Sequence, residues 1–139
     1  MAEGPKKTVL MADDDAEDCM LAAEAFAESG AKAAFSCVLN GVELMDHLKE
    51  HSRSEAKRLP DLILLDLNMP QKDGRQALIE IKSEPALQHI PIVILTTSEV
   101  QKDKDLTLKG GAESFITKPA TFDEWVEMMK SLAESWLQR

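Results

Sequence analysis

Short, continuous apolar runs alternate with amphipathic stretches along the chain, and this alternation limits the folds that it can adopt. The clearest apolar runs are residues 8–12, 62–65 and 92–95, and weaker ones cover 34–39 and 114–116. Strands that are apolar on both faces suit a parallel sheet with helices on either side. Five strands and five helices in strict alternation therefore predict a three-layer α/β sandwich with right-handed crossovers.

The amphipathic stretches carry helix start and stop signals. Asp14 or Asp15 is placed to cap the first helix, which Gly30 would end. The last helix is the most regular, because Thr121 and Glu124 form a capping box ahead of apolar residues spaced three and four apart. The helix between the fourth and fifth strands has the poorest apolar pattern, so we expect it to be mobile or to form an interaction surface.

Length and composition exclude several classes of protein. The 139 residues are expected to form a single domain, with no output domain after the fifth helix. The net charge of −9 speaks against nucleic acid or an anionic membrane as a partner. No apolar run approaches the roughly 18 residues that span a bilayer, and the start does not resemble a signal peptide, so a cytoplasmic location is expected. Cys19 and Cys37 lack metal-ligand spacing, and we expect two reduced thiols.

Charged and hydroxyl side chains follow four of the five predicted strands. The first strand ends in Asp13 and Asp14 and the third in Asp66, whereas the fourth ends in Thr96 and the fifth in Lys118. Because open α/β sheets bind ligands beyond the carboxyl ends of their strands, these residues are expected to meet in one crevice. Carboxylates, a lysine and a hydroxyl suit Mg²⁺ together with a phosphoryl group. One carboxylate would then act as the nucleophile and form an aspartyl phosphate.

The stretch MADDDAED, residues 11–18, places five carboxylates within eight residues. Repulsion among Asp13, Asp14 and the distant Asp66 would be offset when a cation binds. Asp15, Glu17 and Asp18 are interpreted instead as the negative first turn of the first helix, which the helix dipole favours.

The motifs VLMADDD, LILLDLNMP, ILTTS and FITKP resemble, in order and spacing, those of the response-regulator receiver domain of two-component signalling. The resemblance extends over about residues 7–136. It implies a flavodoxin-like fold with a doubly wound, five-stranded parallel sheet in the order 2-1-3-4-5. The long loop before the third strand and the TTS after the fourth further resemble single-domain receivers associated with bacterial phytochromes.

Carried over position by position, the resemblance implies a metal-assisted phosphoacceptor site. Asp66 would accept the phosphoryl group. Mg²⁺ would be held by Asp13, Asp14, Asp66 and the backbone carbonyl of Asn68. Lys118 would assist the transfer by neutralising charge.

The resemblance also implies a switch next to this site. Thr96 would be both a catalytic hydroxyl and the switch hydroxyl, and Phe115 would be the switch aromatic residue. Lys118 would precede a cis proline.

The activity that the resemblance implies is that of a stand-alone response regulator, which catalyses only its own phosphorylation and dephosphorylation. The implied partners are a sensor histidine kinase or phosphotransfer protein as phosphoryl donor and a downstream protein target. A homodimer is an open alternative.

Three other classes of site share part of this pattern. A phosphohydrolase of the haloacid-dehalogenase type also surrounds Mg²⁺ with a strand-one aspartate, a threonine and a lysine, and residues 13–15 contain its D-x-D spacing. Glu17, however, stands where that family expects threonine or valine, and the chain has no cap-sized insertion. A flavodoxin would need hydroxyl and glycine donors where this chain has carboxylates, and a calcium hand would need a glycine in the loop.

Overall fold

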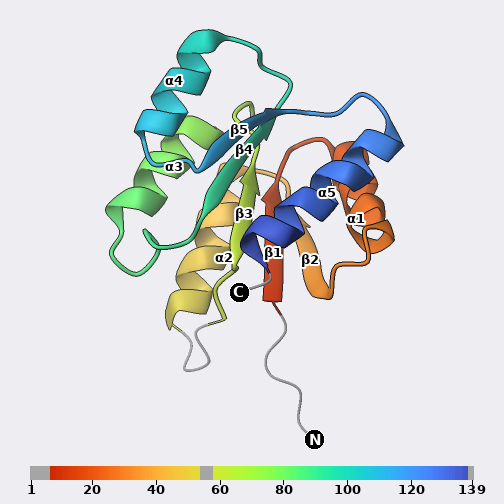
Figure 1. The fold of residues 1–139 in the computed structure, drawn as a ribbon. Helices are drawn as coiled ribbons and strands as arrows, with labels where there is room; N and C mark the ends of the chain where they lie inside the picture. The colour runs from red at the N-terminus through yellow and green to blue at the C-terminus, as the bar shows by residue number, and fades with distance from the viewer. Residues whose placement is uncertain (1–6, 54–57, 138–139) are drawn as a thin grey trace, which may run out of the picture.

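Strands and helices alternate strictly along the chain in this computed structural model, which describes residues 7–53 and 58–137 (Figure 1). The strands are β1 (Lys7–Ala12), β2 (Ala33–Val38), β3 (Leu62–Leu65), β4 (Ile92–Thr96) and β5 (Ser114–Thr117). The helices are α1 (Ala16–Glu28), α2 (Gly41–Arg53), α3 (Gly74–Ser83), α4 (Gln101–Lys109) and α5 (Phe122–Trp136). All five predicted strands are present, and their bounds lie within one residue of the predicted ones.

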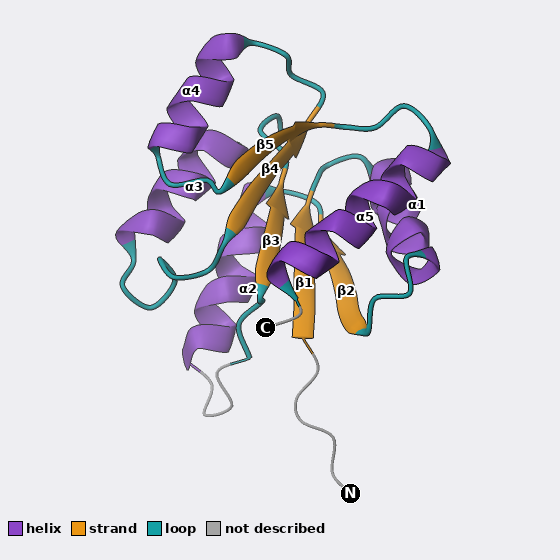
Figure 2. Cartoon of the chain, in the orientation of Figure 1, coloured by secondary structure: helices purple, strands orange, loops and turns teal. Residues whose placement is uncertain are grey.

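The five strands form one parallel sheet in the order β2-β1-β3-β4-β5. Helices α1 and α5 cover one face of the sheet, and α2, α3 and α4 lie on the other (Figure 2). A separate apolar cluster fills the space between the sheet and the helices on each face. This is a flavodoxin-like three-layer sandwich, and the predicted fold class is confirmed. The strand order reverses between β1 and β3, so the carboxyl ends of these strands flank the place where such sheets bind ligands.

The burial of each strand explains why some apolar runs are clearer in the sequence than others. Every residue of the inner strands β3 and β4 is buried, as are the last four residues of β1. The edge strands β2 and β5 are buried only in part. An inner strand is covered on both faces and flanked on both edges, so it needs apolar side chains at consecutive positions. The two strands with weak sequence signals are therefore the two at the edges.

Side-chain caps fix the starts of α1 and α5. Of the two candidates for the first cap, Asp15 is the one used, and it accepts hydrogen bonds from the backbone N–H groups of Glu17 and Asp18. Thr121 accepts from the N–H of Glu124, as the capping box predicts. The beginnings of both helices could thus be read from local sequence.

Helix α4 has the weakest apolar anchoring. Thr107 is the one residue of this fully described helix that is buried, and Val100 and Leu106 are more than half exposed. The residue at its N-cap, Val100, makes no side-chain hydrogen bond. Its poor sequence pattern therefore corresponds to a helix with little contact with the core.

The expectation that Cys19 and Cys37 are two reduced thiols is wrong. Cys19 of α1 and Cys37 of β2 form a disulfide, with 6.2 Å between their Cα atoms. Their sequence separation of 18 gives no hint of this contact, which arises because α1 packs back against the sheet beside β2.

Within residues 7–53 and 58–137, no helix is both long and apolar enough to cross a bilayer.

The loop between β3 and α3 is held by two glycines. Gly74 begins α3 so close to Asp66 that a Cβ on the glycine would overlap the Asp66 carbonyl oxygen. Gly41, which begins α2, lies equally close to the carbonyl oxygen of Lys72. Between them Gln71 has a φ of 68°, which is uncommon for a residue other than glycine. Backbone contacts on two sides therefore set the course of the chain after Asp66.

We expect Gly74→Ala to lower the free energy of unfolding by about 1–3 kcal/mol, because the added carbon can be accommodated only if the loop backbone moves. Urea denaturation measures this loss. Gly110→Ala is the matched control, because its φ is −74° and the nearest atom would lie 3.2 Å from the new carbon. Equal losses in the two variants would contradict the close contact at Gly74.

Candidate functional site

The predicted site residues stand at strand ends, where backbone hydrogen bonds still fix them. The Asp13 N–H donates to the carbonyl of the last residue of β2, at 3.0 Å, and the Asp66 N–H donates to that of β1, also at 3.0 Å. The Lys118 N–H donates to the carbonyl of Thr96, the last residue of β4, at 2.9 Å. The backbone of each of these residues is therefore still fixed by a hydrogen bond to a neighbouring strand.

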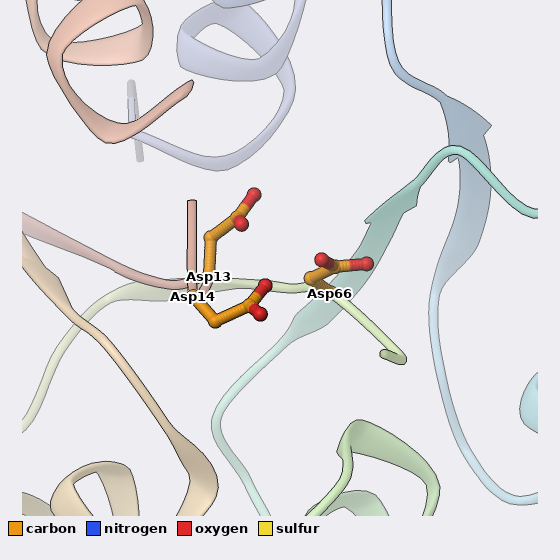
Figure 3. A group of neighbouring side chains, drawn as sticks. All are labelled: Asp13, Asp14 and Asp66. Carbon is orange, nitrogen blue, oxygen red and sulfur yellow. The ribbon is translucent and has the colours of Figure 1, made fainter. Parts of the chain in front are cut away.

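Three carboxylates converge at the ends of β1 and β3. One oxygen from each of Asp13, Asp14 and Asp66 lies within 4.8 Å of the other two. Figure 3 shows Asp13 and Asp14 beside each other, with Asp66 across from them. Asp13 is 0% exposed and Asp66 is 6% exposed, whereas Asp14 faces solvent. The predicted convergence of these residues is confirmed.

Lys118 lies among these carboxylates. Its Nζ is 2.7 Å from Asp13 Oδ2, 2.7 Å from Asp18 Oδ2 and 3.6 Å from Asp66 Oδ2. Burial by itself would lower the pKa of Lys118, but the contacts with Asp13 and Asp18 and the charge of Asp66 outweigh it and hold that pKa above its ordinary value. The lysine is therefore positively charged and is shared among several carboxylates.

One carboxylate oxygen of Asp13 is buried, and its negative charge is only partly offset by its surroundings. Its Oδ1 accepts a hydrogen bond from the Asp15 N–H at 2.9 Å. Its buried Oδ2 is close to Lys118 but has no partner with hydrogen-bond geometry among the described residues. Burial raises the pKa of the Asp13 carboxyl to about 6, although the contacts with Lys118 and Asp15 oppose this rise.

These features fit a hard divalent cation. Mg²⁺ prefers oxygen ligands and binds through one or two carboxylates together with water and phosphate. The three grouped carboxylates supply such oxygens, and the Oδ2 of Asp13 is a buried acceptor with no hydrogen-bond donor of suitable geometry among residues 7–53 and 58–137. A cation here would relieve the repulsion among the carboxylates.

The other predicted residues lie around this cluster. Thr96 is fully buried at the end of β4, and its Oγ1 accepts a hydrogen bond from the Ser98 N–H at 3.3 Å. Phe115 is half-buried in β5 and packs against the apolar cluster on the α2–α3 side of the sheet. Asn68 is exposed two residues after Asp66, and its N–H lies 3.5 Å from Asp66 Oδ1. The roles assigned to these three residues remain predictions.

Two expectations at the site need correction. Asp18 is more than a solvated residue of the first helical turn, because it accepts a hydrogen bond from Lys118 at 2.7 Å. Asp18 lies in the first turn of α1, where the local sequence does not distinguish a carboxylate that faces solvent from one that faces a distant lysine. The Lys118–Pro119 bond is trans rather than cis, since the described residues contain no cis peptide bond. Trans is the isomer that a bond before proline favours intrinsically.

Comparison with known proteins identifies the class of molecule. Residues 9–130 match the response regulator receiver domain. The response regulator Rcp1 of Synechocystis sp. is 33% identical over 134 residues, which cover 96% of this chain and 91% of Rcp1. The phosphorylated cyanobacterial phytochrome response regulator RcpA is 38% identical with a TM-score of 0.85. The Mn²⁺-bound form of Rcp1 is 33% identical with a TM-score of 0.83. Both structural alignments cover 96% of each chain.

This chain thus resembles signalling proteins over nearly its whole length, and its doubly wound sheet carries an acidic cluster and a lysine at the strand ends. The chain belongs to the response regulator receiver domain family of two-component systems. This is a family of signalling domains rather than metabolic enzymes. The alternative of a haloacid-dehalogenase-type phosphatase is not supported.

We expect Asp13 to make the metal-free protein less stable as the pH rises from about 4 to 6. In this window the folded state binds a proton at Asp13 that the unfolded chain, with its ordinary pKa of 3.8, has released. The loss of unfolding free energy should be on the order of 3 kcal/mol. Urea denaturation in a chelator, over a range of pH values, measures it.

The comparison that isolates Asp13 is between wild type and Asp13→Asn, which cannot lose a proton at this position. The variant should lack this component of the pH dependence. Asp46→Asn, on the exposed side of α2, should keep it. The same pH dependence in wild type and Asp13→Asn would contradict the assignment.

Proposed function

We propose that the chain accepts one phosphoryl group on Asp66 from a sensor histidine kinase or a phosphotransfer protein and then switches or relays a signal. One observation carries this proposal. The Asp66 carboxylate lies at the end of an inner strand, is 6% exposed, and has the Lys118 ammonium 3.6 Å away and two further carboxylates beside it. A nucleophile for phosphoryl transfer needs nearby positive charge, and Lys118 provides it.

In the proposed reaction an Asp66 oxygen attacks the phosphorus of a phosphohistidine. A P–O bond forms, the P–N bond breaks, and the imidazole of the donor leaves and takes up a proton. Lys118 offers a point charge and Thr96 a hydrogen bond to the phosphoryl oxygens. The remaining task of the chain is to hold these groups in place, and the strand-ladder hydrogen bonds of Asp66 and Lys118 support that.

The proposed metal is Mg²⁺, held by Asp13, Asp14, Asp66 and the backbone carbonyl of Asn68. When bound, it would neutralise charge on the phosphoryl oxygens and the carboxylates. The grouping of the three carboxylates supports this proposal, as does the Mn²⁺-bound form of the relative Rcp1.

The proposed readout passes through Thr96 and Phe115 to the surface formed by α4, β5 and α5. A phosphoryl group on Asp66 would draw the Thr96 hydroxyl toward it, and the half-buried ring of Phe115 would move into the space left beside β5. The weak anchoring of α4 supports this readout, because a helix with few buried residues can shift at low cost.

We also propose that the receiver acts on a separate protein target. Support comes from the response regulator Rcp1, 91% of whose length aligns with this chain. A homodimer remains an alternative form of the output.

Incubation with acetyl phosphate and Mg²⁺ should add one phosphoryl group to the chain, as measured by intact mass. Asp66→Asn should abolish the addition, because the amide is a poor nucleophile. Asp46→Asn, which removes an exposed carboxylate from α2, should be modified like wild type. Single phosphorylation of Asp66→Asn at the wild-type level would refute Asp66 as the acceptor.

Mg²⁺ should raise the melting temperature at neutral pH, because it binds the folded site and relieves repulsion among its carboxylates. A concentration about 100-fold above the dissociation constant would add about 2.7 kcal/mol to the unfolding free energy. Asp14→Ala should lose this gain, whereas Asp46→Ala should retain it. If Asp14→Ala gains as much stability as wild type, the cation binds elsewhere.

A further inference from the structure

Asp103, in the first turn of α4, lies at the centre of a polar network outside the acidic cluster. Its Oδ1 accepts a hydrogen bond from Arg75 Nε at 2.9 Å, and its Oδ2 accepts one from the guanidinium of Arg75 at 2.7 Å. The hydroxyl of Ser98 donates to the same Oδ2 at 2.9 Å. The Asp103 side chain is 14% exposed and that of Arg75 35%, so the pair is only partly shielded from solvent, and its bidentate geometry is what distinguishes it from an ordinary surface ion pair.

The network reaches the proposed switch hydroxyl through Ser98. The Ser98 N–H donates to Thr96 Oγ1 at 3.3 Å, while the Ser98 hydroxyl is bound to Asp103. Its Oγ also accepts a hydrogen bond from the Val100 N–H at 3.3 Å, so Ser98 is held by three hydrogen bonds. Thr96 cannot turn away from Ser98 without losing one of these bonds or moving a residue that Asp103 restrains.

At its other end the network reaches the loop after Asp66. Arg75 directly follows Gly74, whose Cα lies against the Asp66 carbonyl and whose N–H donates to the Leu67 carbonyl at 2.9 Å. The hydrogen bonds that Arg75 donates to Asp103 raise the pKa of Arg75, and the charges of Asp73 and, less strongly, Asp66 contribute to that rise. Arg75 is thus within the electrostatic influence of the proposed phosphoacceptor.

The same network is the main polar attachment of α4. Its N-cap residue makes no side-chain hydrogen bond, and Thr107 is its one buried residue. A carboxylate in the first turn also favours the helix dipole. The pair formed by Arg75 and Asp103 therefore links a weakly packed helix to the more firmly held start of α3.

We propose that Asp103 is a positioning residue that holds the Thr96 hydroxyl, through Ser98, in its unphosphorylated arrangement, and that its pair with Arg75 sets how readily the receiver switches. The inference rests on the proposed function. More negative charge on Asp66 would compete with Asp103 for Arg75, while the phosphoryl oxygens compete with Ser98 for Thr96. Both effects act against the same network, so its strength opposes the switch.

The test uses beryllofluoride with Mg²⁺ as the probe and amide NMR titration of the full chain as the readout. Asp103→Asn should bind the probe about fivefold more tightly than wild type, because the arrangement without the probe loses stabilisation comparable to that of one hydrogen bond. Asp105→Asn is the matched control, since it makes the same charge change on the same helix and its carboxylate bonds to Gln101. It should bind like wild type.

A second variant isolates the route through Ser98. Ser98→Ala keeps the N–H that binds Thr96 but removes the hydroxyl that donates to Asp103 and accepts from the Val100 N–H, and it should also tighten binding. Ser98→Thr, which retains a hydroxyl, should restore the wild-type affinity. Because Ser98→Ala removes a single oxygen, it also keeps the proposal testable if Asp103→Asn does not fold.

The outcomes separate the inference from the function on which it rests. No probe binding by wild type would overturn the proposed function and the inference together. Wild-type binding with unchanged or weaker affinity in Asp103→Asn, or equal tightening in Asp105→Asn, would overturn the inference alone. Unchanged affinity in Ser98→Ala would overturn the positioning of Thr96 through Ser98. Faster amide exchange in α4 without a change in affinity would show a purely structural role and would also overturn the inference.

Discussion

A single ammonium, that of Lys118, lies among the carboxylates of Asp13, Asp18 and Asp66, and this balance of charge governs how the ends of β1, β3 and β5 can sit together. Each contact offsets part of the cost of burying Asp13 and Asp66. The compensation is incomplete, since the buried Oδ2 of Asp13 is close to Lys118 but has no partner with hydrogen-bond geometry in the described part of the chain. The site therefore carries an excess of negative charge, and a bound cation would reduce it and so stabilise this edge of the sheet.

The molecule combines a firmly held site with a weakly held helix. The inner strands β3 and β4 are buried at every position, and the site residues remain in the strand ladder. Helix α4, by contrast, depends on polar contacts more than on apolar burial. Local opening of a protein begins where few apolar contacts are made. A change of charge at the strand ends can therefore alter α4 while the sheet that holds the acidic cluster stays in place.

The parts that could be predicted from the sequence are those with a local pattern or a topological rule. Unbroken apolar runs predicted β3 and β4, and the rule for parallel strand ends brought Asp66 and Lys118 together although 52 residues separate their numbers. The role of Asp18 escaped prediction, because a carboxylate in a first helical turn looks the same whether it faces solvent or a lysine 100 residues away. The pair Arg75–Asp103 likewise follows from the packing of α3 beside α4, and the pair Cys19–Cys37 from the packing of α1 against β2, neither of which leaves a local signal.

The two glycines beside the β3–α3 loop affect how this surface can diverge between relatives. The atoms that crowd Gly41 and Gly74 include backbone atoms of the loop, so its length and course are constrained independently of the side chains that it displays. Pro70 and Gln71 are exposed, and side-chain exchange there would leave these backbone contacts in place. An insertion of one residue would shift Gly74 away from Asp66. The side chains displayed next to the acidic site can therefore evolve by substitution, whereas insertions and deletions in this loop would disturb the position of Asp66.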